Sequence, residues 1–406
     1  MTNESFGWIV LGLLCISGFM VGVSVYCLPS LYAEITQQIP LTKTQMAMLM
    51  SGFKIAMLFG FVGGSISDKI GPRWAYGLAV LIVSIAGAFR GFSDSATTLI
   101  ACMFFIGIGM SVVFPNIAKS LRMYFPSEKM ALTMGICVTA MGVGAAIGVG
   151  TAADILSPSF NGWRNTLLII GLVTSVPALI WIIFSRDKIE PTTSGVKERN
   201  PAENLREVFK SKNIRTLSLY NIFQMVNFIG VLAFLPISLT ERGISRAGEL
   251  VSIFVIMSSV AAIPIGIISD RVGKRKPFII TASIVFALST IAFSFAEGAF
   301  LIIALLLGGS AVGVIFPLLS VVTVELKEIG PALAATAVGT LLAFGSIGGG
   351  IGPPICGKIM DLTGTQWPGF LLMGSASLLA AIVLLRIPET GQKKAATKLS
   401  SDEFEA

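Results

Sequence analysis

The sequence Gly64-Ser-Ile-Ser-Asp68-Lys-Ile-Gly71-Pro-Arg73 is a short polar turn between two long apolar runs. The same pattern, G-x-x-x-D-[RK]-x-G-x-R, returns in the second half of the chain from Gly266 to Arg275. Glycine permits a sharp turn and close packing, and an acidic residue there can meet the positive end of a helix. Two copies at matching places indicate that the chain consists of two related halves.

Other landmarks repeat in the same register. Phe114-Pro115 recurs as Phe316-Pro317, and Trp163 recurs, with a small shift, as Trp367. A repeat of this length indicates that each half forms the same arrangement of elements. We therefore expect the duplication to span nearly all of both halves.

The composition is that of a polytopic membrane protein. Of the 406 residues 54% are hydrophobic and 13% are charged, and the mean hydropathy is +0.84. A helix needs about 20 apolar residues to cross a bilayer. The run from Trp8 to Leu28 is too long for a signal-peptide core, so we expect it to be retained. The predicted spans lie near 8–28, 44–67, 74–92, 97–118, 131–153, 165–185, 216–239, 248–269, 277–296, 298–322, 332–355 and 367–387.

The repeated loop resembles the loop signature of the major facilitator superfamily. The resemblance implies an all-α integral membrane fold of twelve transmembrane helices, arranged as two pseudo-symmetric six-helix bundles. It also implies a secondary transporter that works by alternating access, with its solute site between the halves near mid-membrane. Within the family, Phe114-Pro115-Asn116 and Tyr124-Phe125-Pro126 are similar to cyanate permeases and nitrate/nitrite porters, and Glu4-Ser-Phe-Gly7-Trp8 is similar to the entry of monocarboxylate carriers.

One long polar segment divides the halves. We predict six-helix bundles at 1–185 and 216–388, a linker at 186–215 and a tail at 389–406. Most of the 29 Lys and Arg residues lie in the linker, the tail and loops on the same side. Because basic loops stay in the cytoplasm, we expect a protein of the cytoplasmic (inner) membrane with both termini cytoplasmic. This distribution explains the net charge of +7 without a nucleic-acid partner.

Lys54 is the residue that points most directly to a solute. It lies near mid-depth in the predicted second span, between Lys43 at one end and Asp68 at the other. A cation at that depth is retained where it faces a polar cavity or a partner. No Asp or Glu lies near mid-depth in any predicted span, so we predict that Lys54 binds an anionic substrate. A structural lysine bonded to backbone carbonyls is the alternative.

Further polar residues complete the predicted substrate site. Asn221, Gln224 and Asn227 recur every three residues on one helix face, and we expect them to line the cavity or to bond across the bundle. Arg90, near the outer end of the third span, is expected either to draw anions to the entrance or to extend its charge to the interface. Tyr26 is a weaker candidate, because single polar residues in spans usually bond to a neighbouring backbone.

By resemblance to the family, the two loops form a gate. Asp68 with Arg73, and Asp270 with Arg275, would make inter-helix contacts that hold one face shut in the outward-open state. These contacts would break as the halves rock. The turns are permitted by the loop glycines: Gly64, Gly71, Gly266 and Gly273. Turn chemistry without gating is the alternative.

No nucleophile–base pair, Cys/His cluster or histidine occurs in the sequence, so we expect no enzyme activity, no metal and no cofactor. The predicted function is secondary transport of a small organic or inorganic anion by a monomer, with a proton or a counter-anion as the coupling ion. One alternative is a proton-coupled exporter of drugs or other amphipathic compounds, which a cavity lined by Met and Phe would favour. The other is a membrane solute sensor that does not transport.

Overall fold

The computed structural model describes residues 3–185, 201–326 and 328–391, and for 60–69 it describes only the course of the backbone. These residues form helices and turns, with no strand. The helices of the first half are α1 Asn3–Tyr26, η1 Leu28–Leu31, α2 Tyr32–Gln38, α3 Lys43–Ala56, η2 Met57–Phe59, α4 Gly60–Phe89, η3 Arg90–Phe92, α5 Ala96–Arg122, α6 Ser127–Thr151, η4 Ala152–Leu156, α7 Ser157–Ser159 and α8 Trp163–Phe184.

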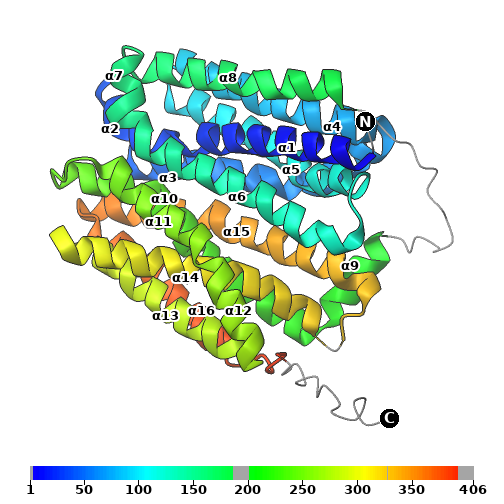
Figure 1. Ribbon diagram of the computed structural model, residues 1–406. Coiled ribbons are helices and arrows are strands. Elements are labelled where there is room, and N and C mark those ends of the chain that lie inside the picture. Colours follow the sequence, from blue (N-terminus) through cyan, green and yellow to red (C-terminus); the bar gives the residue numbers. More distant parts are fainter. Residues whose placement is uncertain (1–2, 186–200, 327, 392–406) are drawn as a thin grey trace, which may run out of the picture.

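The second half repeats the arrangement of long helices. Its helices are α9 Pro201–Lys210, α10 Lys212–Glu241, α11 Ala247–Val260, α12 Ala262–Val272, α13 Lys276–Phe293, α14 Gly298–Glu325, α15 Pro331–Thr363 and α16 Trp367–Leu384. Figure 1 shows the two halves side by side, with the first half in blue to green and the second in green to red. The predicted linker 186–215 contains α9 and the start of α10, and its residues 186–200 lie outside the described part.

Eleven helices among the described residues are long and apolar enough to cross a membrane. The predicted second span runs through α3, η2 and the start of α4, and it is not among these eleven because the side chains of residues 60–69 lie outside the described part. The chain continues through α4 past Gly71, whose φ of 83° breaks the helix there. The non-helical Gly71 separates two helices at the predicted turn, and only glycine adopts this backbone without strain. The predicted all-helical membrane fold is confirmed.

Close packing of α1 on α6 explains the glycine-rich fifth span. A Cβ built on Gly144 would lie 2.0 Å from the carbonyl oxygen of Phe19, and one on Gly148 would lie 2.7 Å from that of Val23. Small residues at these positions let the two backbones touch, as in many membrane helix pairs.

The two halves meet mainly through α3 with α15 and α6 with α11. We call the end of the bundle where α1 begins and α9 lies the terminal end, and the end with α2 and α7 the distal end (Figure 1). Contacts between the halves gather in the distal part: a Cβ on Gly357 would lie 2.7 Å from the Lys43 carbonyl oxygen, and one on Gly248 would lie 2.5 Å from that of Val149. The halves are thus closed against each other at the distal end.

Candidate functional site

Lys54 lies where the first half contacts the second. It stands about 16 Å along the helix from Lys43, and its Cγ is 3.3 Å from the position that a Cβ on Gly349 of α15 would take. One turn earlier, Ser51 donates a hydrogen bond to the Gly349 carbonyl oxygen at 3.2 Å. The Lys54 ammonium lies 5.5 Å from the centre of the Phe53 ring.

No partner satisfies the charge of Lys54 in this conformation. Among the described residues, no carboxylate lies within ion-pairing distance of its ammonium and no carbonyl accepts a hydrogen bond from it. The alternative of a lysine held by backbone carbonyls is therefore not found here. A half-buried cation without a counter-ion attracts an anion from outside the protein.

A cavity of ≈ 840 Å³ lies between the halves. Four of its lining residues carry a hydroxyl, Tyr26, Thr139, Ser258 and Ser259, and the wall is otherwise apolar, with Phe316 among the aromatic residues. The remaining lining residues are Leu132, Gly135, Ile136, Val138, Ala140, Met141, Gly142, Ala145, Phe228, Leu232, Phe254, Val255, Ala262, Val312, Gly313 and Pro317. Tyr26 thus lines the cavity, whereas Lys54 is not among the lining residues.

The three amides of α10 do not line this cavity. Asn221 donates to the Leu341 carbonyl oxygen at 2.8 Å. Gln224 donates to Tyr220 Oη at 3.0 Å and Ser283 Oγ at 2.7 Å, and it accepts from Ser377 Oγ at 2.9 Å. The expectation of cavity lining is corrected for both residues: their helix face turns into the second half, where they join α10 to α13, α15 and α16.

Asn227 lies on the same face and is fully buried. Neither its amide nitrogen nor its amide oxygen has a hydrogen-bond partner among the described residues. It is absent from the cavity wall, so its expected cavity lining is corrected as well. An unsatisfied buried amide destabilises the fold.

Arg90 is fully buried, with 0% of its surface exposed. Its guanidinium donates to the Gly87 carbonyl oxygen at 3.1 Å and to Ser24 at 2.7 Å (backbone O) and 3.1 Å (Oγ), and Nη1 lies 3.6 Å from Met103 Sδ. Both expectations for Arg90, an entrance charge and a side chain extended to the interface, are corrected. The turn η3 directs it inward between α1 and α5, where carbonyl oxygens accept hydrogen bonds from its N–H groups.

The second loop forms a charged cluster within its own half. Arg275 pairs with Asp270 at 2.5 Å and with Glu325 at 3.2 Å, and its backbone N–H donates to Glu389 at 2.7 Å. Burial opposes the Arg275 charge, but the bonds to Glu325 and Asp270 outweigh it and raise the pKa of the guanidinium. Gly273, with φ of 65°, ends α12.

The glycine at the start of this loop has a different environment from the one expected. A Cβ on Gly266 would meet nothing within 4 Å. Close packing therefore does not explain the glycine at that position, and the structure offers no other reason for it.

In the first loop, the side chains are described from position 70 onward. Arg73 donates through Nε to the Ile182 carbonyl oxygen at 2.8 Å, and its own carbonyl accepts from Trp181 Nε1 at 3.0 Å. These bonds tie α4 to α8 within the first half. The side chain of Asp68 and the surroundings of Gly64 lie outside the described residues.

A polar contact between the halves at the distal end was missed by sequence reasoning. Asp361 of α15 accepts the backbone N–H groups of Lys43 at 2.8 Å and Thr44 at 3.0 Å, and the Thr44 hydroxyl at 2.5 Å. Lys43 also pairs with Glu241 of α10, and Gln366 donates to Glu241. We call Lys43, Thr44, Glu241 and Asp361 the distal latch.

The latch places an acidic side chain at the start of a helix from the other half. The first N–H groups of α3 have no partner in their own helix, and a carboxylate there is favoured by the helix dipole. The sequence did carry one signal, because Thr42 and Gln45 form a capping box that marks this helix start. Asp361, the acceptor from the second half, has no sequence motif that marks it as the partner of this helix start.

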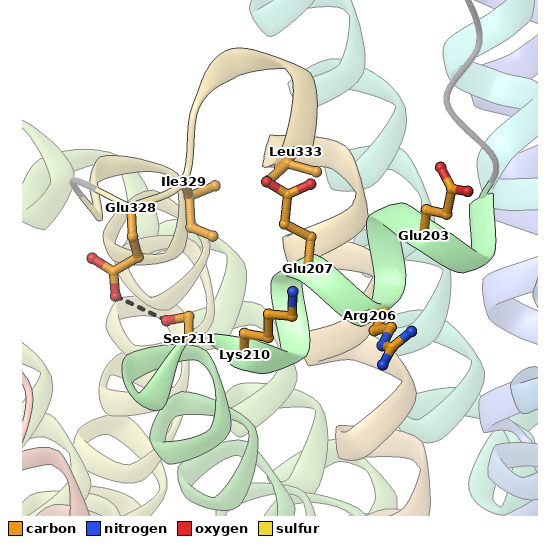
Figure 2. A pocket seen from close by; sticks show the side chains of 8 residues that line it. All are labelled: Glu203, Arg206, Glu207, Lys210, Ser211, Glu328, Ile329 and Leu333. Carbon is orange, nitrogen blue, oxygen red and sulfur yellow. Dashed lines mark hydrogen bonds between the residues drawn. The ribbon is translucent and has the colours of Figure 1, made fainter.

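A second, charged pocket of ≈ 600 Å³ lies at the terminal end, around α9. Its wall consists of Glu203, Arg206, Glu207, Lys210, Ser211, Glu328, Ile329 and Leu333 (Figure 2). Glu328 accepts hydrogen bonds from Ser211 Oγ and Asn213 Nδ2, both at 2.8 Å. Burial raises the pKa of its carboxyl, but these bonds outweigh that effect and hold it below its ordinary value.

Comparisons with known proteins agree with this architecture. The family model of the Major Facilitator Superfamily matches residues 14–249 and 217–401. A hexuronate transporter of Bacillus subtilis (strain 168) is 24% identical over 371 residues, covering 87% of each chain. A nitrite extrusion protein of the same organism is 24% identical over 378 residues, covering 91% of each chain.

A solved structure has the same fold. It is a bacterial homologue of the human lysosomal transporter Spinster in an inward-facing and occupied conformation, with a TM-score of 0.73, 18% sequence identity and coverage of 93% of this chain and 94% of that chain. Because the family model covers most of the sequence, the chain belongs to the Major Facilitator Superfamily and is a multi-pass membrane transporter rather than an enzyme.

Proposed function

We propose that the protein moves a small anion across the bacterial inner membrane by alternating access of its two halves. The observation that carries the proposal is the Lys54 ammonium, which lies between the halves without a counter-ion among the described residues. Hexuronate and nitrite, named for the two relatives above, are both anions. A family of this kind binds its solute between the halves, where each side of the membrane can reach it in turn.

Lys54 is the proposed charge-binding residue, and Tyr26 contributes a hydroxyl from the cavity wall. Arg90, Asn221 and Gln224 support the fold of each half instead, because they are bonded within it and are absent from the cavity wall, as is Asn227. One chain supplies both sides of this site, so a monomer is sufficient. The coupling ion is a proton or a counter-anion, and transport at imposed pH and anion gradients distinguishes them.

The loops at 64–73 and 266–275 are proposed to close the terminal end in the opposite conformation. Their described contacts lie within each half, as expected while the distal latch is closed. We assign the terminal end to the cytoplasm, because α9, the described part of the basic linker, lies there (Figure 1). The described conformation is then inward-facing.

The apolar cavity favours a second candidate, the exporter of amphipathic compounds. Phe228, Phe254, Phe316 and Met141 all line it, and such a wall accepts neutral or cationic drugs as readily as anions. What separates the two candidates is whether binding depends on Lys54. A sensor, by contrast, would bind solute without moving it across vesicles.

A thermal-shift screen of the purified protein tests the proposal. The panel contains small anions, their neutral analogues and lipophilic cations, each measured on the wild type, Lys54→Gln and Lys358→Gln. Lys358 is an exposed lysine on α15 and serves as the matched control. Ligands that bind the folded state raise its apparent stability by mass action.

We expect one class of anions to stabilise the wild type and Lys358→Gln but not Lys54→Gln. Stabilisation by lipophilic cations that persists in Lys54→Gln would instead establish the exporter. Uptake of the stabilising anion into vesicles then separates a carrier from a sensor.

A further inference from the structure

The cavity between the halves has an aromatic, mostly apolar wall, which the binding of a charge by Lys54 does not explain. Phe228, Phe254, Phe316 and Tyr26 place four rings in a wall of mostly apolar side chains, and no charged residue is among its described lining. The Phe228 and Phe316 ring centroids lie 5.3 Å apart in an edge-to-face arrangement. An inorganic oxyanion gains little from such a surface, whereas an apolar group gains from leaving water.

We propose that the solute is an organic anion with an apolar body the size of a single ring. Its acidic group faces Lys54, and its body lies in the cavity against Phe228 and Phe316. This inference rests on the proposed anion transport, and it adds the chemical class of the solute.

The cation lies beside the helix that carries one of these rings. Lys54 of α3 and Ile229 of α10 both lie beside Gly349: a Cβ there would be 2.9 Å from Ile229 Cγ1 and 3.3 Å from Lys54 Cγ. Ile229 directly follows Phe228, whose ring lines the cavity. A ligand that extends from α3 to the Phe228 position of α10 can therefore bind both the cation and the ring.

Three hydroxyls on the cavity wall are free to bind a polar substituent of that body. Tyr26 Oη, Thr139 Oγ1 and Ser259 Oγ have no hydrogen-bond partner among the described residues. Ser258 differs, since its hydroxyl donates to the Val255 carbonyl oxygen at 2.6 Å. Tyr26 and Ser259 come from opposite halves, so a substituent that bonds to both would favour a closed state around the solute.

The test compares matched acids on the purified full chain. Benzoate and cyclohexanecarboxylate carry a ring, formate and nitrate carry charge alone, and benzamide carries the ring without charge. We expect the ring-bearing acids to bind at least about tenfold more tightly than formate, nitrate or benzamide, because they use both features. Dissociation constants come from isothermal titration in detergent.

Two phenylalanines of α14 provide matched variants. Phe316→Ala removes a ring from the wall, whereas Phe300→Ala removes one that is 52% exposed on the same helix. We expect Phe316→Ala to weaken the ring-bearing acids about tenfold and to leave formate and nitrate unchanged, and Phe300→Ala to change neither. Phe228→Leu provides the same test if Phe316→Ala does not fold.

The outcomes distinguish failure of the ring-sized solute from failure of the proposed anion transport. If formate or nitrate binds as tightly as benzoate and binding is lost in Lys54→Gln, the ring-sized solute is excluded and anion transport stands. If benzamide binds as tightly as benzoate, and both bind equally to Lys54→Gln, the proposed function itself is excluded.

Discussion

At the scale of single residues, two amides one turn apart on α10 have opposite surroundings. Gln224 is bonded to three side chains, whereas Asn227 has no partner for either amide atom among the described residues. Gln224→Leu should therefore lower the unfolding midpoint, at a cost of about 1–2 kcal/mol. Asn227→Leu should leave it unchanged or raise it, because it removes an unsatisfied buried group. Thermal unfolding followed by fluorescence measures both.

The same pair tests the correction to the predicted substrate site. Both variants should bind the transported anion with unchanged affinity, since neither side chain lines the cavity. Loss of binding in a folded Gln224→Leu protein would return this amide to the substrate site.

Residue roles were harder to predict than residue depth. The helical period places Asn221, Gln224 and Asn227 on one helix face. It does not determine whether that face meets the first half or the interior of the second half. Arg90 shows the same limit, because the direction of the turn η3 decides that its charge is buried against Ser24. Lys54 could be singled out from sequence, because an unpaired cation at mid-depth has few structural explanations.

At the scale of elements, the apolar runs predicted the spans because span length is fixed by the bilayer. The predicted second span, 44–67, runs through α3, η2 and the start of α4, and hydropathy alone does not register the short 3-10 turn η2 within it. The repeated loop motif correctly marked Gly71 and Gly273, whose positive φ values need glycine. Contacts between halves could not be predicted, because they join positions far apart in sequence.

One carboxylate binds the chain where α9 meets α10, and we expect it to hold both helix ends in place. Glu328 accepts bonds from Ser211 and Asn213 at the start of α10 (Figure 2 shows the first of these). Its pKa is lowered from the ordinary 4.5, so its stabilising contribution is present above pH 4.5 and is lost as the pH falls through the lower value of the folded state. Hydrogen exchange in α9 and the first turn of α10 should therefore accelerate in that acidic range.

A matched pair of variants isolates this effect. Glu328→Gln should accelerate exchange in the same segment at neutral pH, whereas Glu203→Gln, in the same pocket, should not. Equal protection in Glu328→Gln and the wild type would show that α9 is held by its apolar contacts instead, such as the Phe209 ring, whose centroid lies 5.3 Å from that of Phe344.

At the scale of the whole molecule, the distal latch is the feature expected to set the balance between the two conformations. Asp361 accepts three hydrogen bonds from the start of α3 in the other half. Asp361→Asn removes its charge and one acceptor oxygen. Bonds to a charged group contribute about 1.5–3 kcal/mol, so the ratio of molecules closed to molecules open at the distal end should fall by roughly tenfold or more.

Thiol labelling from each side of the membrane measures this shift. In a protein without its native cysteines, Thr139→Cys places a reporter on the cavity wall. A membrane-impermeant reagent should reach it from the cytoplasmic side in the parent, and Asp361→Asn should slow that reaction and accelerate labelling from the outside. Asp94→Asn is the control, because Asp94 pairs with Arg164 within the first half. If both substitutions leave the two labelling rates unchanged, the latch does not control access, and the contacts of α6 with α11 must hold the distal end closed.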